Sequence, residues 1–226
     1  MKRFTAVILA VFILTGAFQT CFAGTSSDLK KLTDCLVKTQ KVDSLEADLI
    51  TKTAGGGQSL DISMHMKAEN IKKGLKSFIT MSVAGQKQDF YLSVAGAKAT
   101  VYMKDPSGKY KATVSDSSKL GDMDVMKSFT SYITIINKNP SMVKKVDKNK
   151  FRLTIPKNKI SEFYAKITGK SLAYAFENMS VEFEVGSDGY LKTVILKVSY
   201  NSINMTLNTK YYNYNKKFNI VLPKVS

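Results

Sequence analysis

The chain has 226 residues, of which 44% are hydrophobic, and it carries a formal net charge of +16 with a single histidine. This length and apolar content are typical of one well-packed domain. The basic excess predicts attraction to an anionic membrane surface or a wall polymer, or else charges spread over solvated faces. Nucleic acid is not an expected partner, because Arg3 and Arg152 are the only arginines and arginine is the preferred reader of guanine.

The N-terminus has the three parts of a secretory signal peptide. Lys2 and Arg3 precede an apolar stretch over residues 4–18, and Cys21-Phe22-Ala23 presents small residues where a signal peptidase cuts. The apolar stretch is short for a membrane span. We therefore expect residues 1–23 to be removed and residues 24–226 to be exported as a single domain, either secreted or associated with the cell envelope. No lipobox precedes Cys21, so a lipid anchor is not expected there.

The first predicted element after the signal peptide is an amphipathic helix over residues 27–41, with Leu32 and Leu36 on its apolar side. Cys35 lies on the same side and is the only cysteine after the leader, so it has no partner for an internal disulfide. A small buried hydrophobic residue is the expected role for it.

Residues 45–114 alternate between apolar and polar side chains, which is typical of antiparallel strands with one buried face. Gly- and Pro-containing turns divide this stretch into six predicted strands. The turns are centred at Gly55-Gly56, Lys73-Gly74, Gly85-Gln86, Gly96-Ala97 and residues 105–108.

Each turn predicts a register between its two strands. The predicted pairs are Leu49 with Ile62, Ala47 with Met64, Met66 with Met81, Ala68 with Ile79, Met81 with Phe90, Ile79 with Leu92, Phe90 with Met103, Leu92 with Val101, Met103 with Tyr110 and Val101 with Ala112. These pairs agree on one apolar face. The opposite face, with Thr80, Asp89 and Tyr91, is expected to be wet.

Further helices are predicted over residues 118–137, with Phe129 and Ile133 on the apolar side, and over residues 157–168. A short strand is expected from Phe151 to Ile155. Hairpins at Asp188-Gly189 and Asn201-Ser202 are expected to pair Val181 with Leu196 and Leu207, and Met179 with Val198 and Met205. A last strand is predicted over residues 217–222.

The expected fold class is therefore α+β. We predict a strongly curved antiparallel sheet of about ten strands, a half-open barrel, with helices lidding its concave apolar face.

This order of elements resembles the LolA-like lipoprotein-carrier superfamily, and more closely its exported relatives of the LppX and LprG kind. The resemblance is carried by residues 42–47 entering the first strand, by residues 101–105 before a turn, and by residues 212–215 leading to residues 220–223. It implies a cavity that holds acyl chains or another lipid between the curved sheet and the helical lid. The lid-locking arginine of LolA has no counterpart here, so energy-driven release to a receptor is not implied.

We expect the apolar ligand to be bound by one set of side chains on the concave face and the lid. They are Leu49, Ile62, Met64, Met66, Ile79, Met81, Phe90, Leu92, Val101, Met103, Phe129 and Ile133. The four methionines suit varied apolar guests, although the same residues would also fill a closed core. That alternative corresponds to an envelope scaffold, an adhesive protein or a stress-sensing domain.

Catalysis is not expected, nor is a cofactor or a metal. His65 lies between Met64 and Met66 and so points to the wet face, and no paired His or Cys spacing of a zinc site occurs. Glu182 and Glu184 are expected to point outward from a solvated strand edge. The protein is expected to act as a monomer.

Overall fold

The structure is a computed structural model that describes residues 27–55, 58–116, 125–163 and 176–225. The predicted signal peptide, the first residues of the second predicted helix and the end of the third lie outside these residues. The elements are α2 (Ser27–Gln40), β1 (Leu45–Gly55), β2 (Gln58–Glu69), β3 (Lys76–Val83), β4 (Gln86–Ala95), β5 (Lys98–Lys104), β6 (Tyr110–Asp116), α3 (Val125–Lys138), η2 (Pro140–Met142), β7 (Val143–Asp147), β8 (Lys150–Ile155), η3 (Lys157–Lys159), β9 (Asn178–Val185), β10 (Leu191–Tyr200) and β11 (Ile203–Tyr212).

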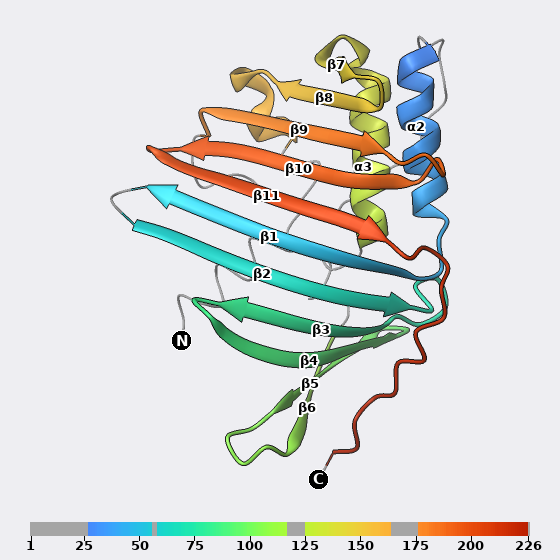
Figure 1. Cartoon of the computed structure of the whole chain (residues 1–226), viewed down its shortest axis with the longest axis vertical. Helices are drawn as coiled ribbons and strands as arrows, with labels where there is room; N and C mark the ends of the chain where they lie inside the picture. Colours follow the sequence, from blue (N-terminus) through green and yellow to red (C-terminus); the bar gives the residue numbers. More distant parts are fainter. Residues whose placement is uncertain (1–26, 56–57, 117–124, 164–175, 226) are drawn as a thin grey trace. The chain divides into compact units, whose positions relative to one another are not determined.

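Eleven strands form one sheet in the order β6-β5-β4-β3-β2-β1-β11-β10-β9-β8-β7 (Figure 1). The strand pairs with a defined register are antiparallel. The predicted α+β class with an open antiparallel sheet is therefore confirmed. β7 was not predicted, because this edge strand is mostly exposed and lacks the apolar alternation of its neighbours.

Contacts within the chain form two compact units. The helical unit comprises the described residues within Met1–Lys41, Thr51–Ser59 and Asp122–Asn208, and the meander unit those within Val42–Ile50, Leu60–Gly121 and Thr209–Ser226. The single-domain organisation stays a prediction.

In the helical unit, α2 packs against α3 and against β9 and β10 (Figure 1). The predicted strand over Phe151–Ile155 is confirmed as β8, whose alternate residues Phe151, Leu153 and Ile155 are buried. Tyr132 of α3 meets Phe183 of β9 edge to face, with ring centroids 5.1 Å apart. The apolar stripes of helix and strand thus bury each other, as their periodicities require.

The β9–β10 hairpin confirms the predicted pairing of Val181 with Leu196 and of Met179 with Val198. Its loop is longer than a two-residue turn, since the N–H of Gly186 donates to the carbonyl of Tyr190. A bulge between Leu191 and Thr193 restores the register.

The meander unit confirms the predicted pairs of β4 and β5, Phe90 with Met103 and Leu92 with Val101. The registers of β2–β3 and β3–β4 were predicted two residues away from the observed ones, in which Met64 pairs with Met81 and Ile79 with Phe90. The β3–β4 turn is centred on Ala84-Gly85, both with positive φ, as a type I′ turn requires. A shift of two residues keeps every side chain on its predicted face.

The β5–β6 register was predicted wrongly by one residue, which reverses the faces of β6. Lys111 rather than Tyr110 lies opposite Met103, and Thr113 rather than Ala112 lies opposite Val101. The expected turn forms, with the N–H of Gly108 donating to the carbonyl of Asp105, but Gly108 is left-handed (φ 81°) and adds one residue to the loop. Hydrogen bonds from Ser107 and Lys109 stabilise the Asp105 carboxylate in this loop and lower its pKa.

The predicted last strand over residues 217–222 was wrong, because this segment has no regular secondary structure. Asn213, Asn215 and Asn219 adopt left-handed conformations that interrupt an extended chain. The backbone N–H groups of Phe218 and Ile220 donate to the two carboxylate oxygens of Glu69, at 3.2 and 3.0 Å. A side chain of β2 thus takes the role that a neighbouring strand would have had.

Replacing Glu69 by Gln should loosen this C-terminal segment while leaving the sheet intact. A neutral amide loses the charge-assisted hydrogen bonds and has one acceptor oxygen instead of two. Hydrogen exchange at the Phe218 and Ile220 amides should become faster by about tenfold or more. Asp61→Asn, on the exposed side of the same strand, is the control, and unchanged exchange in Glu69→Gln would contradict the assignment.

Candidate functional site

Nine of the expected ligand-binding residues form a continuous set in the meander unit, which we call the apolar row. They are Ile62, Met64 and Met66 of β2, Ile79 and Met81 of β3, Phe90 and Leu92 of β4, and Val101 and Met103 of β5. The observed registers place these side chains on neighbouring strands. Leu49 of β1 is half-buried.

Burial varies within the apolar row: Met64 of β2 and Leu92 of β4 are both 5% exposed, and Met66 of β2 is half-buried. Ile62 and Ile79 are 4% and 2% exposed, whereas Phe90 and Val101 are half-buried and Met103 is 39% exposed. The row ends at β5 because the residues of β6 opposite Val101 and Met103 are Thr113 and Lys111. The row therefore has buried members on β2, β3 and β4 and leaves apolar surface at its end on β5, where Met103 lies.

The two expected lid residues lie on α3, in the helical unit. Phe129 is 1% exposed and Ile133 is half-buried. Their place over the apolar row stays a prediction.

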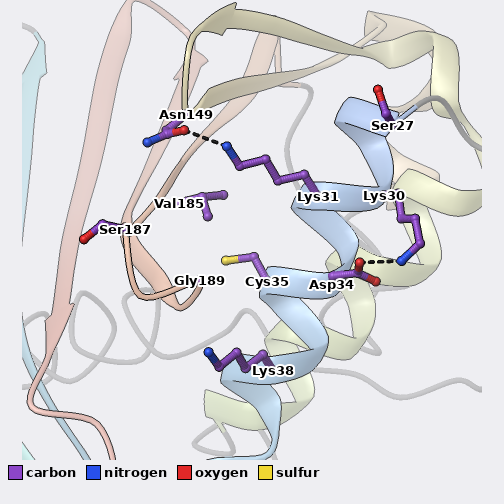
Figure 2. Close-up of a pocket in the computed structure, with 11 residues that line it drawn as sticks. Ser27, Lys30, Lys31, Asp34, Cys35, Lys38, Asn149, Val185, Ser187 and Gly189 are labelled. Atoms are coloured by element: carbon purple, nitrogen blue, oxygen red, sulfur yellow. Dashed lines mark hydrogen bonds and ion pairs between the residues drawn. The ribbon is translucent and has the colours of Figure 1, made fainter.

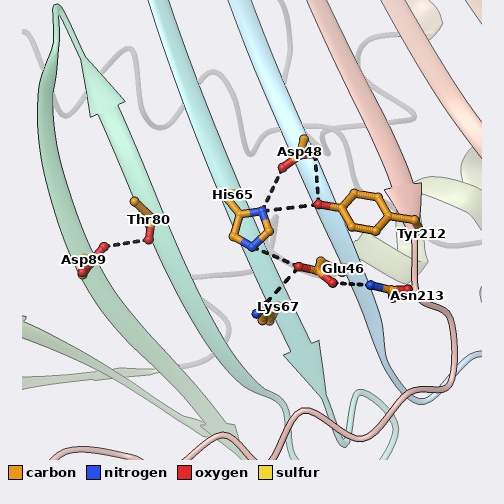
Figure 3. Close-up of polar contacts among 8 residues, drawn as sticks. All are labelled: Glu46, Asp48, His65, Lys67, Thr80, Asp89, Tyr212 and Asn213. Carbon is orange, nitrogen blue, oxygen red and sulfur yellow. Dashed lines mark hydrogen bonds and ion pairs between the residues drawn. The ribbon is translucent and has the colours of Figure 1, made fainter.

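The solvent face of the meander unit carries a polar cluster that the sequence analysis did not predict. Figure 3 shows His65 of β2 between two carboxylates of β1. Its Nε2 lies 3.1 Å from Glu46 Oε1 and its Nδ1 lies 2.8 Å from Asp48 Oδ1. A neutral imidazole has one N–H, so only the imidazolium donates to both carboxylates.

Three further side chains complete this His65 cluster. The hydroxyl of Tyr212 donates to Asp48 Oδ2 at 2.9 Å, and Asn213 Nδ2 donates to Glu46 Oε2 at 2.6 Å. Lys67 lies 3.8 Å from Glu46. Because Glu46 is buried, these partners stabilise a carboxylate that would otherwise be costly to bury. Glu46 and Asp48 are two residues apart and so lie on the same face of the strand, and this spacing was the signal in the sequence from which the cluster could have been predicted.

His65 does point away from the apolar row, as predicted, and Thr80 of the next strand donates to Asp89 on the same face (Figure 3). Within the described ranges, no group of three or more His, Cys, Asp or Glu side chains is suited to hold a metal ion.

Glu182 and Glu184 point outward, as predicted, but β9 is an inner strand rather than an edge. Burial disfavours the charged form of Glu182, yet the hydrogen bond and charge of Lys197 and the charge of Arg152 keep its pKa below the usual range. Lys192 donates to Glu184 at 2.8 Å and lowers its pKa as well. Both carboxylates therefore serve in cross-strand ion pairs.

The helical unit contains a cavity of about 540 Å³ beside α2. Figure 2 shows Lys31, Cys35 and Lys38 of α2 facing Val185 and Gly189 of the β9–β10 region. Cys35 is 2% exposed, as predicted for a buried thiol, and burial raises its pKa to about 12. It is therefore a neutral, inert thiol at physiological pH. In the part of the chain that the structure describes, no helix is both long and apolar enough to span a membrane.

No protein-family model matches the sequence, and no curated protein matches it. Among solved structures, the chain is similar to LprF from Mycobacterium bovis, with a TM-score of 0.50 and 11% identity over 88% of this chain and 97% of that chain. It is also similar to the lipoprotein LppX from Mycobacterium tuberculosis, with a TM-score of 0.46 and 14% identity over 86% of this chain and 98% of that chain. A LolA superfamily protein from Nitrosomonas europaea matches with a TM-score of 0.36 and 8% identity, over 88% and 96% of the two chains. The expected resemblance is confirmed at the level of the fold.

Tyr212 should make the protein less stable at alkaline pH. Burial and the hydrogen bond to Asp48 raise its pKa from 10.0 to about 12. Between these values the unfolded chain loses the proton first, so the contribution of Tyr212 to stability is full below pH 10 and is lost as the pH rises toward 12. Tyr212→Phe should show a smaller loss of unfolding free energy over this interval in denaturant titrations.

Asp48→Asn provides the matched control for the origin of this effect. It removes the carboxylate that accepts the hydrogen bond from Tyr212 but leaves the tyrosine ring in place. The pKa of Tyr212, followed by ultraviolet absorbance, should therefore be lower in this variant than in the wild type. An alkaline stability profile of Tyr212→Phe that parallels the wild type would contradict the role of this hydroxyl.

Proposed function

We propose that the protein is an exported, non-enzymatic carrier that binds a lipid or another acyl chain along the apolar row. The observation that carries the proposal is the exposed end of the row. Phe90 of β4 pairs with Met103 of β5. Phe90 is half-buried, and Met103 is 39% exposed. A patch of this kind, continuous with a buried apolar surface, suits a ligand that continues the core.

The fold supports this proposal without deciding the ligand. The chain shares the fold of LprF over nearly the whole length of both chains, and the resemblance noted in the sequence implies acyl-chain binding for this class of sheet. Export of residues 24–226 and a place in the cell envelope belong to the same proposal.

The apolar row has the chemistry that such a ligand requires. Met64, Met66, Met81 and Met103 have flexible thioether side chains that repack around guests of different shape. Burial at about 0.8 kcal/mol per methylene would give a chain of about 14 carbons roughly 11 kcal/mol. Immobilisation of ligand and side chains removes several kcal/mol of this, which still permits micromolar binding without polar contacts.

The proposal assigns no catalytic step to any residue. The His65 cluster lies on the opposite side of the strands from the apolar row, since His65 alternates with Met64 and Met66 along β2. The contacts of His65 with Glu46 and Asp48 link β2 to β1, and a hydrogen bond from Asn213 to Glu46 links β1 to the residues that follow β11. We assign it the role of holding these segments together.

Replacing Leu92 by Lys should abolish ligand binding, because it places an ammonium group in the middle of the row, where Leu92 is 5% exposed. Native mass spectrometry of protein purified without detergent should show a bound acyl species in the wild type and none in Leu92→Lys. Ser93→Lys is the matched control, since the neighbouring residue of the same strand points to the other face and this variant should keep its ligand.

A second variant separates loss of binding from loss of folding. Met103→Lys changes a residue that is already 39% exposed, so the fold should persist while uptake of a fluorescent fatty acid falls. A wild-type protein that has no bound acyl species and takes up no fatty acid would overturn the proposal and favour a scaffold with a filled core.

A further inference from the structure

The cavity beside α2 is separate from the apolar row and belongs entirely to the helical unit. One wall is the face of α2 that carries Lys31, Cys35 and Lys38, which recur at the spacing of successive helical turns. The other wall is formed by Asn149 and by Val185, Gly186, Ser187 and Gly189 of the β9–β10 region (Figure 2). The volume of about 540 Å³ is in the range of small-molecule sites.

Two lysines reach across this cavity to acceptors that carry no formal charge. Lys31 Nζ donates to Asn149 Oδ1 at 2.7 Å, and Lys38 Nζ donates to the backbone carbonyl of Asp188 at 2.7 Å. Lys38 also lies over the ring of Tyr190, 4.2 Å from its centroid. These contacts orient the two ammonium groups but do not neutralise them.

The β9–β10 loop is shaped around Lys38. Gly189 has a φ of +77°, and a Cβ atom at this position would lie 3.4 Å from Lys38 Nζ. Glycine thus provides both the left-handed conformation and the close approach of the lysine.

Two carboxylates, those of Asp34 and Asp188, lie near the cavity. Asp34 pairs with Lys30 at 2.6 Å, and both side chains are largely exposed. Asp188 Oδ1 accepts the N–H of Tyr190 at 3.1 Å. Asp188 does not line the cavity, but its negative charge acts on Cys35, as do the positive charges of Lys31 and Lys38. The three lysines of the lining therefore outnumber the two carboxylates of Asp34 and Asp188, which leaves an excess of positive charge.

Between the two ammonium groups the surface is apolar. Cys35 and Val185 are 2% and 4% exposed, and Figure 2 shows both directed into the space between the helix and the hairpin. The raised pKa of Cys35 keeps its thiol neutral. A ligand that matches this surface carries a negative charge and a short apolar body.

We propose that this cavity is a binding site for a small organic anion, in which Lys31 and Lys38 hold a carboxylate or phosphate group and the apolar body lies on Cys35 and Val185. Lysine binds either group as a point charge. The site takes a different class of ligand from the apolar row, and it lies on different strands.

The proposal can be tested on the mature chain by titrating hexanoate, hexyl phosphate and hexanol while recording amide NMR spectra. Saturable shifts confined to α2, Asn149 and residues 185–189 are expected for the two anions. The anion with the higher affinity shows whether the site prefers a carboxylate or a phosphate group. Hexanol, with the same apolar body and no charge, should bind at least about tenfold more weakly.

Lys31→Gln and Lys38→Gln should each weaken anion binding by about tenfold, since each removes one charge-assisted contact. Lys41→Gln is the matched control, because it removes an equal charge just beyond α2, outside the lining, and should change the affinity by less than about twofold. Spectra of the free variants report whether each one is folded.

The site would be disproved by hexanol binding as tightly as the anions, by wild-type affinity in both glutamine variants, or by the absence of saturable shifts. Shifts that appear only in β2–β5 would place the ligand on the apolar row and would also overturn this proposal. Because the two sites are read out by different amides, either can fail while the other stands.

Discussion

Antiparallel pairing with alternating side chains is the constraint on which the candidate sites depend. Along β2, Met64 and Met66 lie on the apolar row while His65, between them, meets two carboxylates on the other face. A shift of one residue in the register would exchange these two faces. The turns prevent such a shift, because Ala84-Gly85 and Gly96 supply the positive φ angles that short hairpins need.

The β5–β6 hairpin shows how strongly one loop residue affects the extent of the apolar row. The left-handed Gly108 lengthens the loop, and the polar residues Lys111 and Thr113 then lie opposite Met103 and Val101. The apolar row ends there instead of extending to the edge of the sheet. An edge strand with polar residues on this face also resists pairing with another chain, so the longer loop both limits the apolar row and protects the edge.

Polar side chains take over where the regular sheet ends. Glu69 accepts two backbone N–H groups of the C-terminal segment, and Glu46 accepts a hydrogen bond from Asn213. In the helical unit, Thr39 of α2 accepts the N–H of Leu191 at 2.9 Å and so supports the strand next to a bulge. The contacts of Glu69 and Thr39 satisfy backbone N–H groups, and the contact of Glu46 satisfies a side-chain amide. The two proposed sites differ in the side chains that they present. The apolar row presents thioethers, and the cavity beside α2 presents two ammonium groups next to an apolar surface.

The sequence by itself determined the fold class, the faces of β2 to β5 and the places of most turns, because hydrophobic alternation and glycine placement are local signals. It also determined that Cys35 is buried and that His65 points away from the apolar row. The tertiary structure alone decided the registers of β2–β3, β3–β4 and β5–β6, the irregular C-terminal segment and the cavity beside α2. Loop geometry set the registers, and the hydrogen bonds of Glu69 set the C-terminal segment. At the cavity, the contacts of Lys31 and Lys38 join residues more than 100 positions apart in the chain. Side chains that meet over such separations leave no periodic pattern in a single sequence, so only the folded chain brings them together.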